Sequence, residues 1–153
     1  RVPFVKQLMQ GVSRRLEDAR SNGSVRSLKG RKCRFDLWEP KGFEMKKALP
    51  KEEALVTYGQ TTQLKRAFTY KALNRLIQAS AADMTKQAMV NLYNQGVTPL
   101  LQIHDELDCS VKDIDAARDI ARIMETALEL RVPSKCDIDL GASWGEAKAI
   151  KYV

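Results

Sequence analysis

The chain has 153 residues, 44% of them hydrophobic and 29% charged, with a formal net charge of +7. This length can bury one core of ordinary size, so we expect one domain or a compact piece of a larger one. No run approaches the roughly 20 apolar residues that cross a bilayer, and no signal-peptide pattern opens the chain, so we expect no membrane contact. The first residue is Arg1 and not methionine, which suggests a fragment or a processed product.

The spacing of the cysteines and the distribution of charge indicate the cellular compartment and the kind of surface to expect. Cys33, Cys109 and Cys136 lie far apart and form no CxxC pair, which is typical of reduced thiols in a cytoplasmic protein. Residues 1–75 hold 18 Lys and Arg against 7 Asp and Glu, or +11, whereas residues 76–153 hold 8 against 12, or −4. A basic half and an acidic half suit a nucleic-acid surface beside a metal site, and a well-solvated surface is the alternative explanation.

The N-terminal third predicts a helix followed by a basic hairpin. The helix covers about residues 3–20 and has one apolar face, formed by Val5, Leu8, Met9, Val12 and Leu16. Residues 25–28 and 33–35 flank Lys29-Gly30 and predict a β-hairpin. Its cations permit either a phosphate contact or an exposed edge protected by charge. These cations are Arg26, Lys29, Arg31, Lys32 and Arg34.

The middle of the chain predicts a long loop and then a long helix. Residues 37–61 contain two prolines, two glycines and mixed charges without a sustained period, so we expect a loop with one helical turn near residues 46–49. Residues 62–93 contain neither proline nor glycine and predict one helix. Its expected apolar stripe is Leu73, Leu76, Ile77, Ala81, Met84, Ala88 and Leu92.

A second face of this predicted helix carries polar side chains. Arg66, Tyr70, Asn74 and Gln78 recur at every fourth position and would line one side. Every base pair presents acceptors in the minor groove, to which Asn, Gln and Arg donate without reading sequence. The row therefore predicts either minor-groove contact or an ordinary polar helix face.

The segment LLQIHDELDCSV, residues 100–111, contains the single histidine followed by two carboxylates. It predicts two short strands joined near residues 104–107, with Leu100, Leu101 and Ile103 as a buried approach. Asp105 and Glu106 would then lie at the turn. Mg²⁺ prefers carboxylate oxygens, so this turn is a candidate metal site, although acidic turns are also common without one.

Two segments, RAFTYKALNRLIQASAADMTKQAM and LLQIHDELDCSV, together resemble the C-terminal palm of family A DNA polymerases, which include bacterial DNA polymerase I and many phage replicases. The counterparts are Asn74, Gln78, the SAAD run at 80–83, and residues 104–106, which resemble the hairpin called motif C. VRSLKGRKCRF resembles the family's basic hairpin, and IDLGASWGEAK its closing strand. The resemblance covers essentially the whole chain.

The resemblance implies a role for each matched residue. Asp105 would bind the catalytic Mg²⁺ ions, Glu106 would be an auxiliary carboxylate, and His104 would approach the primer end. Asn74 and Gln78 would contact the minor groove of primer-template DNA. The remaining DNA-binding candidates are Arg31, Arg34, Arg66 and Tyr70.

The implied reaction is attack of a primer 3′-hydroxyl on the α-phosphate of a deoxynucleoside triphosphate, with two metal ions offsetting charge. Family members also use a second aspartate from an earlier strand and a nucleotide-gripping fingers helix, and neither motif occurs in this chain. Asp83 and Asp108 are poor replacements, because the first faces helix packing and the second stands where the family has an apolar residue. We expect the last part of a polymerase, inactive alone, which shares two Mg²⁺ ions with an upstream part.

Several positions depart from the bacterial pattern. Tyr70 stands where bacterial members have an arginine, and Ala79 stands where the family usually has glycine. The loop before the long helix is also longer. These differences resemble a phage-type branch, which would place the protein in the cytoplasm of a bacterial host.

The C-terminal segment is predicted to form a helix and a strand that support the palm and to contain no separate functional site. Residues 114–128 have helical periodicity, Cys136, Ile138 and Leu140 alternate as a final strand, and Trp144 is expected to fill the core. The fold class is therefore α+β, a partial palm with antiparallel hairpins packed on long helices. Residues 1–61 would be the end of the fingers region, and residues 62–153 the C-terminal palm with motif C.

Three functions remain open. The first is a polymerase part, the second a non-catalytic DNA-binding remnant that does not depend on Asp105, and the third a metal-dependent nuclease. The nuclease is the weakest of the three, because residues 104–106 alone supply too few ligands.

Overall fold

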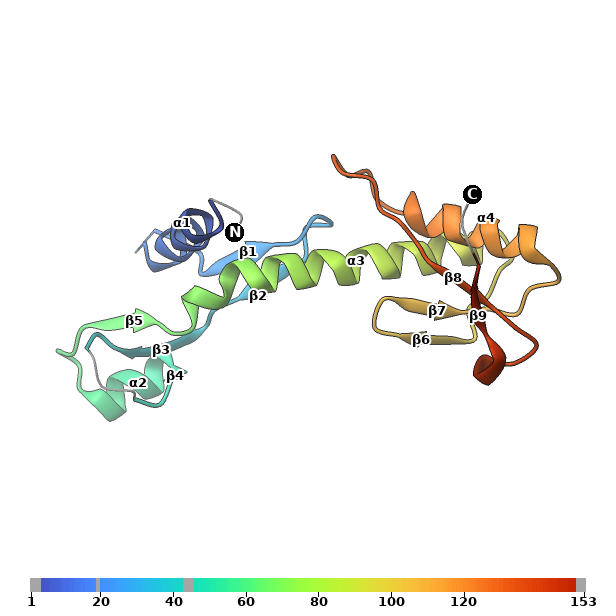
Figure 1. Cartoon of the computed structure of the whole chain (residues 1–153). Coiled ribbons are helices and arrows are strands. Elements are labelled where there is room, and N and C mark those ends of the chain that lie inside the picture. The colour runs from blue at the N-terminus through green and yellow to red at the C-terminus, as the bar shows by residue number, and fades with distance from the viewer. Residues whose placement is uncertain (1–3, 19, 43–45, 151–153) are drawn as a thin grey trace. The chain divides into compact units, whose positions relative to one another are not determined.

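The computed structural model describes residues 4–18, 20–42 and 46–150 and has a mixed α+β fold (Figure 1). It divides into two compact units, Arg1–Ser80 and Ala81–Val153, and the division falls within the longest helix. The assignment of residues 1–61 and 62–153 to polymerase subdomains stays a prediction, because compactness does not identify a subdomain.

The first unit begins with helix α1 and a hairpin of β1 and β2. A small antiparallel sheet in the order β4-β3-β5 follows, together with helix α2, the short 3₁₀ turn η1 and the start of helix α3. The bounds are α1 Val5–Glu17, β1 Ser24–Arg26, β2 Lys32–Arg34, β3 Leu37–Pro40, β4 Leu49–Pro50, α2 Lys51–Tyr58, β5 Leu64–Arg66, η1 Thr69–Lys71 and α3 Ala72–Asn94.

The core of the first unit forms where α1, the end of the hairpin and the start of α3 meet. Leu16, Phe35 and Ala72 are buried there, with Val12 and Val25 packed against them. The predicted apolar face of α1 is buried only at its C-terminal end, because Leu8 is 53% exposed. The predicted helix and hairpin are both present: α1 lies within its expected segment, and each hairpin strand begins one residue earlier than predicted.

Residues 37–61 are not the expected long loop. β3 pairs with both β4 and β5, and α2 begins directly after Pro50 with two acidic residues in its first turn, where the helix dipole favours them. The helical turn expected near residues 46–49 is wrong, because Leu49 pairs with Trp38 in the sheet. Strands of two to four residues are too short to show a period, which is why the sequence pattern hid them.

The long helix starts ten residues later than predicted, at Ala72 rather than position 62. Residues 64–66 instead form β5, and Phe68 has a left-handed backbone with φ 60°, which a helix cannot continue through. Of the expected apolar stripe, Leu73, Ala88 and Leu92 are buried, whereas Ile77 is 57% exposed. The stripe is therefore a packing surface only in part.

The second unit combines the end of α3 with two hairpins and helix α4. The bounds are β6 Leu101–Ile103, β7 Glu106–Asp108, α4 Ile114–Glu125, β8 Ile138–Leu140, the 3₁₀ turn η2 Trp144–Glu146 and β9 Lys148–Ile150. β6 pairs with β7 and β8 with β9, both antiparallel. Trp144 is 69% exposed, so the prediction that it fills the core is wrong.

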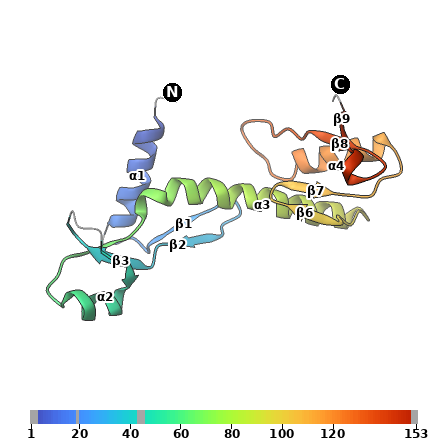
Figure 2. The same ribbon diagram turned by 60° about the horizontal axis from the view of Figure 1, so that its bottom comes forward.

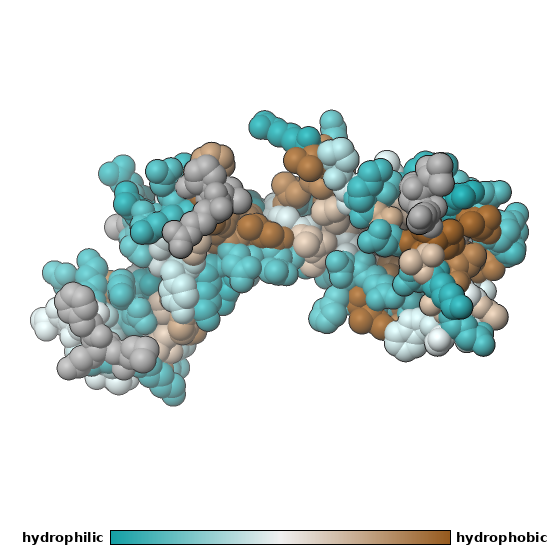
Figure 3. Space-filling view, in the orientation of Figure 1, coloured by the Kyte–Doolittle hydropathy of each residue, from teal (hydrophilic) through white to brown (hydrophobic). Residues whose placement is uncertain are grey.

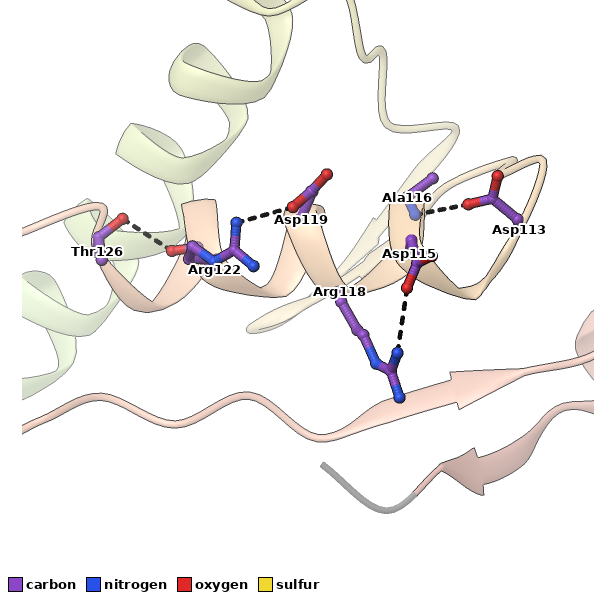
Figure 4. Close-up of polar contacts among 7 residues, drawn as sticks. All are labelled: Asp113, Asp115, Ala116, Arg118, Asp119, Arg122 and Thr126. Atoms are coloured by element: carbon purple, nitrogen blue, oxygen red, sulfur yellow. Dashed lines mark hydrogen bonds and ion pairs between the residues drawn. The ribbon is translucent and has the colours of Figure 1, made fainter. Parts of the chain in front are cut away.

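Helix α4 is stabilised by a capping hydrogen bond and by ion pairs along its own length (Figure 4). The Asp113 carboxylate accepts a hydrogen bond from the Ala116 backbone N–H at 2.8 Å and caps the helix. Arg118 pairs with Asp115 at 3.1 Å, and Arg122 pairs with Asp119 at 2.8 Å. Both arginines of α4 are thus paired with carboxylates on the same helix.

Large apolar side chains are exposed in both units, and Figure 3 shows apolar surface among hydrophilic residues. No helix among the described residues is both long and apolar enough to cross a membrane. The most exposed examples are Phe4, Leu28 and Val56 in the first unit, and Tyr93, Leu100, Val132 and Trp144 in the second.

Candidate functional site

The predicted acidic turn is a tight β-hairpin in the second unit. Ile103 pairs with Glu106, so only His104 and Asp105 lie between the strands. His104 has φ 55°, a conformation that histidine tolerates better than most residues but that still costs about 1 kcal/mol or more. The Gln102 side-chain amide donates a hydrogen bond to the His104 carbonyl at 3.0 Å. Histidine at this position therefore carries a conformational cost that glycine would avoid.

Carboxylates gather around this turn without being buried. Asp105 and Glu106 are exposed, and Asp108 is half-buried. Alternation along β7 places Glu106 and Asp108 on one face of the hairpin, while Asp105 belongs to the loop. Exposed carboxylate oxygens are the donors that a hard divalent cation takes, so Asp105 and Glu106 fit such an ion chemically.

Two expectations about this hairpin need correction or limits. The approach to the turn is not buried, because Leu100 is 72% exposed and Leu101 is 48% exposed. In the part of the chain that the structure describes, no three His, Cys, Asp or Glu side chains group closely enough to hold a metal ion. Among the described residues, the turn therefore brings too few such side chains together to form a metal site by itself.

Asp83 is buried on α3, as expected for a packing position.

The thiol next to this hairpin is shielded. Burial raises the pKa of Cys109 above its ordinary value of 9.0, and the neighbouring Asp108 carboxylate raises this pKa further. Cys136 behaves in the same way, with burial first and then Glu125 and Asp137 raising its pKa. Both thiols are therefore protonated near neutral pH and are weak nucleophiles.

The basic hairpin is well formed in the first unit. Val25 pairs with Cys33, Gly30 has φ 81° in the connecting turn, and all five cations are exposed. The Arg26 guanidinium donates to the Gly30 carbonyl at 2.9 Å, which fixes one side chain along the turn. No carboxylate occurs between residues 24 and 35. The hairpin is therefore a concentrated positive surface suited to phosphates.

The predicted row of four polar residues is reduced to two. Asn74 and Gln78 are both exposed, one turn apart on α3. Tyr70 lies in η1 and is 61% exposed. Arg66 lies in β5, so the prediction that all four share one helix face is wrong.

Arg66 is committed to the fold of the first unit. Its guanidinium donates to the Phe35 carbonyl at 3.0 Å and to the Ser21 carbonyl at 3.3 Å, and lies 4.5 Å from the centre of the Trp38 ring. A Cβ on Gly23 would lie 2.3 Å from an Arg66 nitrogen, and Gly23 has φ 66°, so a larger residue there would be strained and would displace the Arg66 guanidinium. These contacts favour a structural role for Arg66 over a DNA contact.

Sequence reasoning missed two residues that join the basic hairpin to α3. The Leu28 backbone N–H donates to the Ser80 hydroxyl at 3.2 Å, and the Arg75 guanidinium donates to the Arg34 carbonyl at 3.1 Å. Ser80 belongs to a run of small residues, which indicated helix packing only. Arg75 is adjacent to Asn74 and could have been noticed as a cation within the polar segment.

Comparison with known proteins identifies relatives over nearly the whole chain. The family model described as DNA polymerase family A matches residues 1–146. A DNA-directed DNA polymerase of Pseudomonas phage M6 is 35% identical over 147 residues, 96% of this chain and 18% of the relative. DNA polymerase I of Lactococcus lactis subsp. cremoris is 31% identical over 97% of this chain and 15% of the relative.

A thermostable DNA polymerase I of Thermus aquaticus is similar too, at 30% identity over 90% of this chain and 15% of the relative. The chain thus spans less than a fifth of the length of these curated relatives. Among these three, the phage enzyme has the highest identity, in agreement with the expected phage-type branch. The match over residues 1–146 shows that the chain belongs to DNA polymerase family A.

Proposed function

We propose that this chain is the C-terminal part of a template-directed DNA polymerase, which adds deoxynucleotides to a primer 3′-hydroxyl. The observation that carries the proposal is the exposed His104-Asp105-Glu106 turn, held between paired strands in a chain of this family. The relatives are named as DNA polymerases, which supports the activity. The substrates are primer-template DNA and deoxynucleoside triphosphates.

The second unit supplies the acidic part of the proposed centre. Family A DNA polymerases generally use divalent metal ions, and Asp105 and Glu106 are the residues that would hold two Mg²⁺ ions together with an upstream aspartate. When bound, such ions stabilise charge on the attacking and leaving oxygens. The tight turn contributes by holding Asp105 on a rigid hairpin and by directing His104 towards the primer end.

The first unit supplies the proposed DNA surface. Asn74 and Gln78 are exposed donors suited to minor-groove acceptors, and Arg31 and Arg34 are exposed cations suited to phosphates. Tyr70 is exposed beside the start of α3 and remains a candidate contact. Arg66 would act indirectly, through its hydrogen bonds to Ser21 and Phe35.

An upstream part of the polymerase is the proposed partner. Exposed apolar side chains in both units, including Leu8 and Leu100, are available for contact with such a partner. We extend the proposal to the subdomains, with residues 1–61 as the end of the fingers and residues 62–153 as the palm. The site of action would be the cytoplasm of a bacterial host.

The test is primer extension with Mg²⁺ and all four deoxynucleotides. The chain is assayed alone and after addition of the upstream coding segment expressed separately. Extension by the mixture and not by either part supports the proposal. Extension by the chain alone would contradict the shared metal site, and no extension by a mixture that assembles would contradict the polymerase proposal.

A non-catalytic DNA-binding remnant is the second candidate. It is favoured by one observation: within the described ranges the basic surface of the first unit is fully formed, whereas the acidic turn lacks a third ligand nearby. This candidate predicts duplex binding that is unaffected by Asp105→Asn, in both the chain and the mixture, with no extension by either.

A further inference from the structure

A hollow in the first unit is lined by cations and by a tryptophan. Its lining comes from the end of α1, from strands β3 and β5 and from helix α2, and its volume is about 650 Å³. Figure 2 shows the sheet that contains β3 between α1 and α2. A volume of this size is typical of pockets that take small organic ligands. The hollow is therefore large enough for one nucleotide.

The charged side chains of the hollow favour an anion. They are the cations Lys41, Lys51, Lys65 and Arg66 and the carboxylates Glu17 and Asp18. Both carboxylates accept hydrogen bonds within the fold, Glu17 from the Thr69 hydroxyl at 2.7 Å and Asp18 from the Arg20 backbone N–H at 2.8 Å.

Two of the four cations are available to a ligand. Lys65 pairs with Glu39 at 3.3 Å, and Arg66 donates to two backbone carbonyls. Lys41 and Lys51 are exposed, and neither forms an ion pair with a carboxylate in the part of the chain that the structure describes. Their ammonium groups are therefore suited to phosphates.

Trp38 gives the hollow an aromatic surface. Its ring is half-buried, and its centre lies 4.5 Å from the Arg66 guanidinium and 5.4 Å from the Lys51 ammonium. Arg66 is held in place by its hydrogen bonds, whereas Lys51 is exposed and has a flexible stem. An incoming base can therefore replace Lys51 against the ring, and the displaced ammonium can turn to a phosphate.

We propose that this hollow binds one nucleotide of a single-stranded DNA segment, with the base against the Trp38 ring and the adjacent phosphates against Lys41 and Lys51. Sites for single strands combine a positively charged groove with aromatic side chains on which bases stack, without reading sequence. A duplex keeps its bases stacked on one another, so the tryptophan favours a single strand. The proposal goes beyond the proposed polymerase function, because this second contact does not use the turn at Asp105.

The experiment measures binding of the whole chain to a fluorescent thymidine oligonucleotide without Mg²⁺, at several salt concentrations. The ligands compared with it are an abasic strand, which keeps every phosphate, a duplex of equal length and free deoxythymidine triphosphate. The intrinsic fluorescence of Trp38 is recorded with unlabelled ligands in a Trp144→Phe background, because Trp38 and Trp144 are the two tryptophans of the chain.

The first variant combines Lys41→Gln with Lys51→Gln and leaves the ring in place. It should bind the thymidine strand about tenfold more weakly and lower the salt slope by about 1.4, since each phosphate contact of a single strand contributes about 0.7. The matched control combines Lys6→Gln with Lys47→Gln, which removes equal charge from two exposed lysines outside the lining of the hollow. The control should leave affinity and slope nearly unchanged.

The second variant, Trp38→Leu, tests the stacking contact. It should bind the thymidine strand about tenfold more weakly, with the salt slope and the affinity for the abasic strand unchanged, because no cation is lost. The thymidine strand should quench the fluorescence of Trp38, whereas the abasic strand and the duplex should not. If Trp38→Leu fails to fold, the quenching and the lysine variants still decide, because both keep the ring.

Absence of quenching by a bound thymidine strand would overturn this inference, and so would equal losses in the two lysine pairs. Equal quenching by the duplex, or displacement of the strand by the free triphosphate, would overturn the assignment to a single strand. If the chain binds no single strand, the inference is wrong, whereas the primer-extension test of the polymerase proposal is unaffected.

Discussion

The two units of this chain carry opposite charge on different kinds of scaffold. Residues 76–80 contain no charged side chain, so the first unit, to residue 80, keeps the +11 of residues 1–75 and the second keeps −4. The first presents cations on a hairpin without carboxylates, whereas the second pairs its helix arginines with aspartates and exposes carboxylates at a turn. The cationic surface and the exposed carboxylates of the turn therefore belong to separate units.

The buried side chains of the two units differ as well. The first unit buries Leu16 and Phe35, whereas the second buries Leu92 with alanines from α3 and α4. Among the described residues, each unit has one fully buried leucine, Leu16 at 2% exposure and Leu92 at 0%. This pair allows the packing of the two units to be compared by the same chemical change.

The largest expected effect on stability comes from removing these leucines. Leu16→Ala and Leu92→Ala should each lower the free energy of unfolding by about 2–5 kcal/mol, through lost burial and an unfilled cavity. Urea denaturation measures the loss, with exposed Leu130→Ala as a control in the second unit. A loss below 0.5 kcal/mol at either buried leucine would contradict the described core.

The next prediction tests the charge division directly. Replacing Arg31 and Arg34 by glutamine should weaken duplex binding about tenfold or more and lower the salt slope by about two. The matched control replaces Arg118 and Arg122 by glutamine, which removes equal charge from α4. An equal loss in the control would show that net charge alone, and not the basic hairpin, attracts DNA.

Two left-handed residues give a smaller, opposite pair of effects. His104→Gly should raise stability by about 0.5–1 kcal/mol, because glycine adopts φ 55° without strain. Phe68→Gly relieves the same kind of strain at φ 60° but removes a half-buried ring, so it should lower stability. Thermal melting of both variants measures the difference, and stabilisation by Phe68→Gly would refute this reading of the first unit.

The smallest effect concerns the two shielded thiols of the second unit. Because burial raises the pKa of Cys109 and Cys136 above 9.0, their contribution to stability is complete below pH 9 and decreases as pH rises through the folded-state pKa values. Stability measured from pH 8 to 10.5 should fall less in a Cys109→Ala, Cys136→Ala variant. An equal fall in both proteins would mean that the thiols are not shielded.

Sequence reasoning succeeded where the period or the motif was long. It located α1, the basic hairpin, α4 and β8, and it recognised the family from residues 74–106. It failed for β3, β4 and α2, because two to eight residues carry little periodic signal. It also extended α3 across Phe68, since a left-handed phenylalanine has no signature comparable to proline or glycine.

The candidate site shows the same limits. The pattern identified the acidic turn and placed Asp105 and Glu106 at or beside it, and their catalytic role stays a prediction. It could not reveal that Arg66 donates to two backbone carbonyls, or that Ser80 receives the Leu28 amide, because both depend on contacts between distant segments. Helical spacing alone had assigned Arg66 to the face of Asn74.

A graft tests most directly whether the turn at Asp105 serves DNA synthesis. This chain replaces the matched region of the Pseudomonas phage M6 polymerase. Primer extension is measured with Mg²⁺ for the graft, its Asp105→Asn variant and an Asp139→Asn control, because Asp139 is an exposed carboxylate on β8. We expect extension by the graft and the control and a loss of about a thousandfold with Asp105→Asn, since metal-held charge stabilisation contributes several kcal/mol. Undiminished extension with Asp105→Asn would contradict this role.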